Sequence, residues 1–343
     1  MRMTFSWRSA VKPLAIAAAI GMYLVYVLGT IVTNTNSGQG CGRTWPLCRG
    51  KFIPEFAITT AIEYVHRVAT GIEGLLIIAV AILALLYWRQ RREIQILVPA
   101  MVVFLLIEAV LGGIVAQSPR QPVVLAFHFG SSLLLLVSVV LTAVVVYEAN
   151  GGTDAVRDRP VPRWFIAAVW ALFALTYVAG YLGAYVEHTG IGLACSQWPT
   201  CRSGELVPPL VGATGASITL NLLHRSLALL LALGTFALYW RARQLRRGRP
   251  DLYRASVAAL IVLTLQALAG AYLVYSQLSL GSRLIHASLV ALYVVVMSYV
   301  ALHLLPRPAA YRVKIIHRAP AGAPRVATAP ATALETAPNS EQG

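Results

Sequence analysis

Charged side chains are scarce in this sequence. Of its 343 residues, 12% are charged and 58% are hydrophobic. Soluble globular proteins of ordinary composition have about twice that charged fraction, so the sequence excludes this class. The apolar stretches are continuous and lack the alternating pattern of porin strands, which argues against a membrane barrel. The composition therefore predicts an integral membrane protein built from helices.

Eight stretches are long and apolar enough to cross a bilayer as helices, which takes about 20 residues each. We expect these spans near residues 13–33, 64–88, 95–117, 122–147, 164–186, 220–240, 255–276 and 284–305. Most of the 28 Lys and Arg residues then lie on one side, and the positive-inside rule places both termini in the cytoplasm. The net charge of +15 comes from short clusters beside the spans, such as 241–249. Such clusters are typical of proteins that contact anionic membrane lipid, and we expect no nucleic-acid partner.

The first apolar stretch lacks a small-residue cleavage site close behind it, so we interpret it as a retained helix and not as a secretory signal. No Arg-rich, acid-poor transit segment precedes it, which favours the plasma membrane of a prokaryote over a mitochondrial membrane. Residues 306–343 are rich in Ala, Pro and Thr and almost without aromatic residues. This composition predicts a disordered cytoplasmic tail.

The sequence contains an internal repeat. His66 and His128 are separated by 62 positions, as are His224 and His286, so a shift of 158 superimposes the two pairs. The same shift, or one of 154 near the start of each copy, aligns further pairs: Arg67 with Arg225, Glu108 with Gln266, Gly112 with Gly270, Gly29 with Gly183, and Cys41 with Cys195. We therefore predict an all-α membrane protein of two tandem four-helix units, 1–150 and 151–305, related by a pseudo-twofold axis along the membrane normal.

The four repeated histidines predict haem binding. In the expected topology all four lie at one depth near the outer face, and two imidazoles on neighbouring helices can reach a metal between them. A single histidine near a helix end is usually an interfacial side chain, but packing gives no reason for four at matched positions. We therefore predict a bis-histidine haem site in each half. The unmatched residues His188, His303 and His317 are interpreted as ordinary side chains.

Arg67 and Arg225 directly follow two of these histidines. An arginine there can bind a haem propionate bidentately where it emerges toward water. An ordinary interfacial arginine explains the position equally well.

The two copies differ at acidic positions. Glu63 is matched by Asn221, and Glu108 by Gln266. A carboxylate within a membrane is expensive and typical of function, whereas an amide cannot take up a proton at neutral pH. We infer that the first half carries out chemistry with proton transfer or a developing positive charge, and that the second half holds a bound group unchanged. Glu73, matched by Leu231, is a weaker candidate that pairing within the bundle would also explain.

The four cysteines lie in two loops, CGRTWPLC from Cys41 to Cys48 and CSQWPTC from Cys195 to Cys201. Both loops are expected outside, where an oxidising compartment favours a disulfide in each. The shorter second loop leaves it open whether Cys195 and Cys201 bridge. A zinc site is the competing interpretation, but its usual C-x2-4-C spacing is absent. The lack of C-x-x-C-H excludes covalent c-type haem, and the loops can be structural or redox-active.

Together, the EYVHR motif at 63–67, the four histidines and the paired cysteines resemble the bacterial type of haem A synthase, over residues 10–305. The resemblance implies oxidation of the C8 methyl group of haem O to the formyl group of haem A through a hydroxymethyl intermediate, with water as oxygen source. It assigns His224 and His286 as the axial ligands of a haem b cofactor. It places His66 and His128 at the substrate haem and makes Glu63 the essential acid.

The resemblance implies haem O as substrate. It leaves open the electron acceptor, for which a quinone is a candidate, and the entry route of the substrate, which we expect to arrive laterally from the lipid or from the haem O synthase. A homo-oligomer is compatible with the sequence, which does not fix the oligomeric state.

Three other functions compete with this interpretation. A non-catalytic diheme b-type cytochrome between quinol and a partner predicts two identical, unchanged haems. A transporter predicts no haem and paired Gly or Pro breaks near the membrane midplane, which the sequence lacks. A structural assembly subunit leaves Glu63 and Glu108 unexplained.

Overall fold

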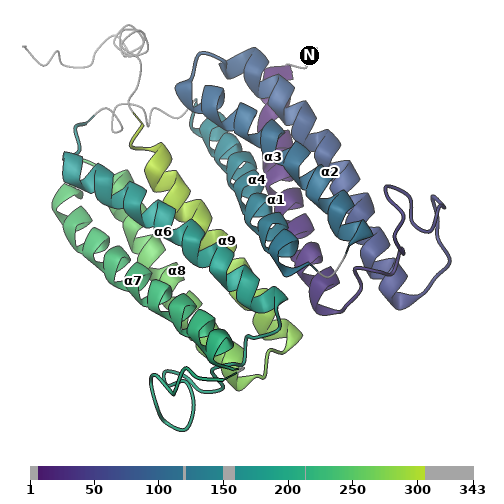
Figure 1. Cartoon of the computed structure of the whole chain (residues 1–343). Helices are drawn as coiled ribbons and strands as arrows, with labels where there is room; N and C mark the ends of the chain where they lie inside the picture. Colours follow the sequence, from purple (N-terminus) through teal and green to yellow (C-terminus); the bar gives the residue numbers. More distant parts are fainter. Residues whose placement is uncertain (1–6, 119–120, 150–158, 213, 306–343) are drawn as a thin grey trace, which may run out of the picture. The chain divides into compact units, whose positions relative to one another are not determined.

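The computed structural model describes residues 7–118, 121–149, 159–212 and 214–305. Within these ranges the chain forms eight long helices and no β-strand (Figure 1). The helices are α1 (Trp7–Asn34), α2 (Ile58–Trp88), α3 (Arg92–Gln117), α4 (Pro122–Glu148), α6 (Arg163–His188), α7 (Gly215–Leu245), α8 (Pro250–Tyr275) and α9 (Leu280–Leu302). The tail at 306–343, for which we predict disorder, lies outside the described residues, and so does His317.

All eight described helices are long and apolar enough to cross a membrane, which confirms the predicted all-α, multi-pass membrane fold. Four helices, α1, α2, α7 and α8, begin five or six residues before their predicted spans. Counting apolar residues finds only the part of a helix that lies in hydrocarbon. The residues before these spans are helical as well, and in α2 they include Glu63.

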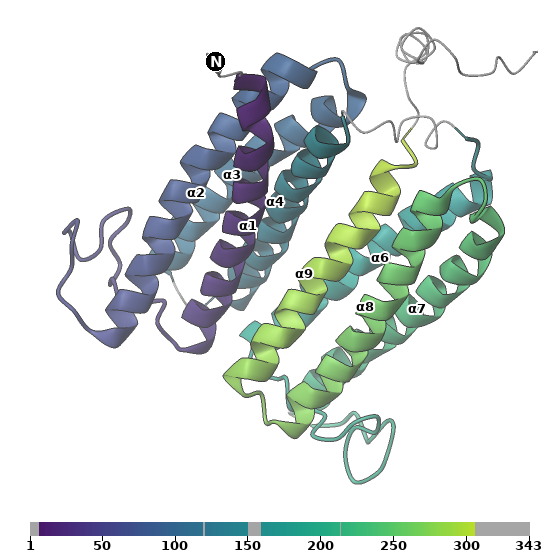
Figure 2. The same ribbon diagram turned by 180° about the vertical axis from the view of Figure 1, so that it is seen from behind.

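The helices pack in two groups of four. In the first group, α1 and α3 each pack against both α2 and α4, and in the second, α6 and α8 each pack against both α7 and α9. Figures 1 and 2 show both groups. The second and fourth helices of each group therefore lie diagonally across it. The pseudo-twofold axis and the division of the chain at residue 150 remain predictions.

The two groups meet through α4 and α9. Helix α4 packs against α6 and α9, and α9 also packs against α1. As a consequence, 72% of an apolar 18-residue stretch of α4 is buried inside the protein. The corresponding share is 17% for α7, which faces outward. Polar side chains add a link between α1, α6 and α9. The Asn34 amide donates to Glu187 Oε1 at 3.1 Å, and Arg283 Nη1 donates to Asn34 Oδ1 at 2.8 Å.

Both cysteine pairs form disulfides, Cys41–Cys48 in the α1–α2 loop and Cys195–Cys201 in the α6–α7 loop. The structure confirms the expected first disulfide and answers the open question about the second. Figure 1 shows both loops at one end of the helices, which we call the cysteine-loop end. The four sulfur-bearing side chains are buried, so each disulfide forms the small core of its loop.

An arginine after each disulfide fixes the start of its loop. Arg49 Nε donates to the carbonyl of Gly40 at 3.1 Å, and Arg202 Nε donates to the carbonyl of Ala194 at 2.7 Å. The two loops are therefore built alike although their cysteine spacings differ.

Candidate functional site

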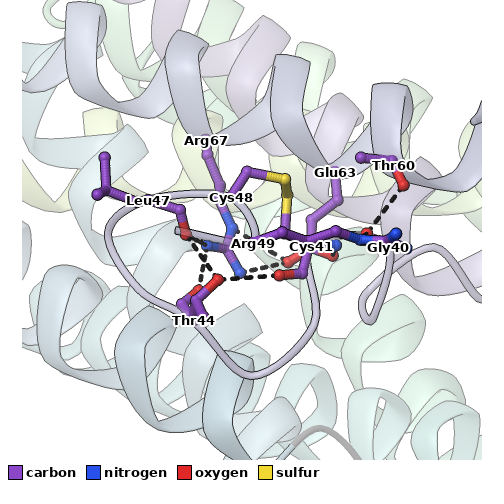
Figure 3. The surroundings of a disulfide bond; sticks show 9 residues. All are labelled: Gly40, Cys41, Thr44, Leu47, Cys48, Arg49, Thr60, Glu63 and Arg67. Carbon is purple, nitrogen blue, oxygen red and sulfur yellow. Dashed lines mark hydrogen bonds and ion pairs between the residues drawn. A yellow bond between two sulfur atoms is a disulfide. The ribbon is translucent and has the colours of Figure 1, made fainter. Parts of the chain in front are cut away.

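Glu63 lies in the second turn of α2 and is buried, with 4% of the residue exposed. Its Oε1 accepts hydrogen bonds from Nε and Nη2 of Arg67 at 3.0 and 2.6 Å. Its Oε2 accepts from the backbone N–H of Cys41 at 2.8 Å (Figure 3). Residues four apart share a helix face, which brings the carboxylate and the guanidinium together. Glu63, the predicted acid, thus forms an ion pair with Arg67 and binds the first disulfide loop directly.

The two repeated arginines hold the backbone carbonyls of their loops. Arg67 Nη1 donates to the carbonyls of Thr44 and Leu47 at 2.6 and 3.1 Å. Arg225 Nη1 donates to the carbonyls of Gln197 and Thr200, both at 2.9 Å, and its Nη2 donates to that of Cys195 at 3.0 Å. These bonds explain why arginine stands at both positions, because one guanidinium offers several donors in a fixed plane. The predicted contact with a haem propionate remains a prediction.

Asn221 also binds its loop, but as a hydrogen-bond donor. Its amide nitrogen donates to the carbonyls of Ile191 and Gly192 at 3.2 and 3.0 Å. Glu63 accepts from the first loop, whereas Asn221 donates to the second. The loop backbone therefore presents an N–H to the acid in one half and carbonyls to the amide in the other.

His66 and His224 each face a glycine of the preceding helix. A Cβ atom added to Gly29 of α1 would lie 3.3 Å from Cε1 of His66. One added to Gly183 of α6 would lie only 2.7 Å from Cε1 of His224. The missing side chain at each glycine provides the room for the imidazole. This explains why the two glycines follow the same repeat as the histidines.

His128 and His286 also pack against a glycine of the preceding helix. An added Cβ at Gly112 of α3 would lie 3.8 Å from Cε1 of His128. An added Cβ at Gly270 of α8 would lie 3.6 Å from Cε1 of His286. All four repeated histidines therefore pack against glycine on a neighbouring helix of their own group.

The histidines of each pair lie on diagonal helices, whereas the sequence suggested neighbouring ones. His66 on α2 lies within electrostatic reach of His128 on α4, and His224 on α7 within reach of His286 on α9. The two imidazoles of a pair therefore come from helices that are not adjacent in the group, whereas the axes of adjacent helices lie about 8–10 Å apart.

Two of these histidines have a buried ring nitrogen that is open to a bound group. Nδ1 of His66 and Nδ1 of His224 are buried, and no side chain or backbone atom within the described ranges hydrogen-bonds to them. Buried polar atoms are normally paired, so such nitrogens suit a bound group. The part of the chain that the structure describes has no cluster of three or more His, Cys, Asp or Glu for a free metal ion. A haem needs only axial ligands, because the porphyrin supplies the other nitrogens.

Glu108 and Gln266 contact the second histidine of each pair. Glu108 Oε2 lies 3.2 Å from Nδ1 of His128, and Glu108 Oε1 accepts a hydrogen bond from Ser131. The amide nitrogen of Gln266 lies 3.1 and 3.0 Å from the two ring nitrogens of His286. Sequence reasoning identified Glu108 as asymmetric but did not connect it to His128. The sequence held a signal for this contact. Glu108 precedes His128 by 20 positions, and Gln266 precedes His286 by the same number.

Glu73 is a third carboxylate that is found only in the first half. It is 5% exposed and lies against α1, where a Cβ added at Gly21 would clash with its Oε2. Its Oε1 is buried without a hydrogen-bond partner among the described residues. Gly21 therefore makes room for Glu73, as Gly29 does for His66.

The two unmatched histidines that the structure describes lie at helix ends. His188 is the last residue of α6. His303 caps α9, with its Nδ1 2.9 Å from the Tyr299 carbonyl oxygen and its Nε2 3.4 Å from Glu148. Both positions fit ordinary structural side chains.

Comparison with known proteins agrees with this architecture. Residues 12–298 match the COX15-CtaA family, described as cytochrome oxidase assembly protein. The chain belongs to this family. The match includes both cysteine loops, all four repeated histidines, Glu63 and Glu108.

Similar curated proteins from bacteria are named haem A synthase. The protein of Bacillus pumilus is 35% identical over 298 residues, covering 85% of this chain and 94% of its own. That of Symbiobacterium thermophilum is 34% identical over 300 residues, covering 87% and 96%. That of Exiguobacterium sp. is 34% identical over 286 residues, covering 83% and 90%. The resemblance seen in the motifs is confirmed, and the chain is a multi-pass membrane protein with bacterial relatives.

In this family member the two halves share one frame but differ at two polar positions. Each half has a histidine pair packed on glycines and a disulfide loop held by arginine. The first half adds Glu63 beside the loop and Glu108 beside the histidine. The second half has amides at both positions, so only the first can accept protons there.

Proposed function

We propose that this chain is a haem A synthase, which oxidises the C8 methyl group of haem O to the formyl group of haem A through a hydroxymethyl intermediate. The observation that carries the proposal is the pair of matched histidine sites with carboxylates at only one of them. One site then suits a substrate that is transformed, and the other suits a cofactor that is retained. The names of the relatives support haem A synthesis.

The second half would hold haem b. His224 and His286 would hold it, and the amides of Asn221 and Gln266 would keep the surroundings neutral. When bound, a haem held by two imidazoles would supply one-electron transfer. Arg225, at the cysteine-loop end of this site, would be the partner of a propionate.

The first half would hold haem O between His66 and His128. Each oxidation, from methyl to hydroxymethyl and from hydroxymethyl to formyl, releases two electrons and two protons, and water supplies the oxygen in the first. Positive charge develops on the substrate as electrons leave, and a fixed carboxylate stabilises it or takes a proton from the attacking water. We assign this role to Glu63. Glu108 orients His128, and Arg67 fixes Glu63.

The electrons require an acceptor, for which a quinone in the membrane is our proposal. We place both termini in the cytoplasm and the cysteine-loop end outside, in agreement with the positive-inside rule. The functional halves are residues 1–150 and 151–305. Haem O would come from the bilayer or from the haem O synthase.

The direct test is to purify the protein from a host that also makes haem O, extract the non-covalent haem and identify it by mass. Haem B together with haem O, its hydroxymethyl form or haem A is the expected result. Haem B alone, at two per chain, would favour a diheme cytochrome that transfers electrons. Absence of haem would contradict both functions.

A further inference from the structure

An apolar groove lies between α4 and α6, where the two groups of helices meet. It encloses about 560 Å³ and is lined by residues of these two helices. Its walls include Val123, Ala126 and Phe127 from α4, and Val178, Tyr181 and Leu182 from α6. The volume lies in the range of about 300–1,000 Å³ that is typical of small-molecule sites.

The groove lies beside the candidate site of the first half. The ring of Tyr181 packs directly on α4, where a Cβ added at Gly130 would clash with its Cε1. Ser131, which follows Gly130, donates to Glu108, and Glu108 is 3.2 Å from His128. One wall of the groove is therefore linked through Glu108 to a histidine of the proposed substrate site.

The rim of the groove faces outward from the helices. Val123, Phe127 and Val178 are 52%, 55% and 56% exposed, although all three belong to membrane-spanning helices. The surroundings of such side chains are hydrocarbon and not water. A ligand in this groove therefore reaches it sideways from the bilayer and is itself apolar.

The matching junction in the second half is built differently. By the repeat shifts, Gly130 corresponds to Ser288 on α9, Tyr181 to Val27 and Tyr185 to Ile31 on α1. At that junction the Tyr23 hydroxyl donates to Ser288 at 3.0 Å and joins the two helices. Gly130, Tyr181 and Tyr185 therefore distinguish the α4–α6 junction, which lies next to the site of the first half, from the α9–α1 junction.

We propose that the α4–α6 groove binds the prenyl chain of the haem substrate. This inference rests on the proposed function, because haem O carries a farnesyl chain and haem B does not. A long apolar chain gains affinity in proportion to the area that it buries in a groove. The groove therefore selects haem O over haem B for the first half and admits it from the lipid.

The test compares two tryptophan variants at matched positions. Val178→Trp fills the groove, and Leu24→Trp places the same ring at the corresponding position of α1, where Leu24 is 54% exposed. Haem O and haem B are titrated optically into protein purified from a host that makes only haem B. Val178→Trp should weaken haem O binding at least about tenfold, which is about 1.4 kcal/mol, and leave haem B binding unchanged. Leu24→Trp should change neither affinity.

A second measurement uses the unmodified chain. A haem O analogue with a photoreactive group on its farnesyl chain should label α6 around Val178 and Leu182, and haem O should compete for the label. Labelling elsewhere, equal haem O affinity in both variants, or an equal loss for haem B would overturn the groove proposal while haem O still binds. If the unmodified chain binds no haem O, the proposed function itself fails, and the groove proposal fails with it.

Discussion

The two halves of this protein hold their disulfide loops with the same arginine but with side chains of opposite hydrogen-bonding character. In the first half, Glu63 accepts from the N–H of Cys41 and from Arg67. In the second half, Asn221 donates to two loop carbonyls. The first loop presents a backbone N–H to the acid, and the second presents carbonyls to the amide. Each loop backbone therefore fits the side chain of its own half. The comparison teaches that a repeated frame can keep its histidines and its loop-binding arginine while the polar residues beside them differ between the copies.

The largest effect is expected from removing the acid of the first half. Glu63→Gln keeps the size of the side chain but removes its charge and its ability to take up a proton. We expect haem O turnover to fall at least about a hundredfold, with both haems still bound. Conversion of haem O by purified protein measures the rate, and Glu55→Gln, the same exchange at an exposed acid of the first loop, is the control with unchanged turnover. Full turnover of Glu63→Gln with both haems bound would rule out the assigned role.

A smaller effect is expected when the first histidine contact is made to resemble the second. Glu108→Gln replaces the carboxylate beside His128 by the amide found beside His286. An amide can still orient the imidazole, so we expect turnover to fall about tenfold, at the low end for a group that assists proton transfer. Ser131→Ala, which removes only the hydroxyl that donates to Glu108, should have less effect. A larger loss in Ser131→Ala than in Glu108→Gln would contradict this order.

The smallest effects concern the glycines that face the histidines. Alanine is about 1 kcal/mol more favourable than glycine inside a helix, but overpacking costs about 1–3 kcal/mol. Gly183→Ala, with its Cβ only 2.7 Å from His224, should lower both thermal stability and haem B content. Gly29→Ala has 3.3 Å to His66 and should be nearly neutral in stability. Thermal melting measures the stability of both variants, and haem absorbance measures their haem content. Equal losses in the two variants would contradict the closer packing of Gly183 on His224.

Much of the fold could be predicted from the sequence because apolar length and repetition are local signals. They located eight helices, both disulfide loops and the matched histidines. The diagonal placement of His66 and His128 could not be predicted, because the order of helices in a bundle depends on packing between distant segments. The partners of Arg67 and Arg225 were also missed, since backbone carbonyls of a loop become acceptors only once the loop has folded. Glu108 was noticed as an asymmetry, but its contact with His128 depends on how α3 is rotated against α4.

The central claim is that the halves divide the work, and two double variants test it most directly. His66→Ala with His128→Ala, and His224→Ala with His286→Ala, are purified from a host that makes both haem B and haem O, and the extracted haems are identified by mass. The account predicts that the first variant retains haem B but loses haem O and its oxidised forms, and that the second loses haem B. Loss of the same haem from both variants, or the reverse assignment, would contradict it.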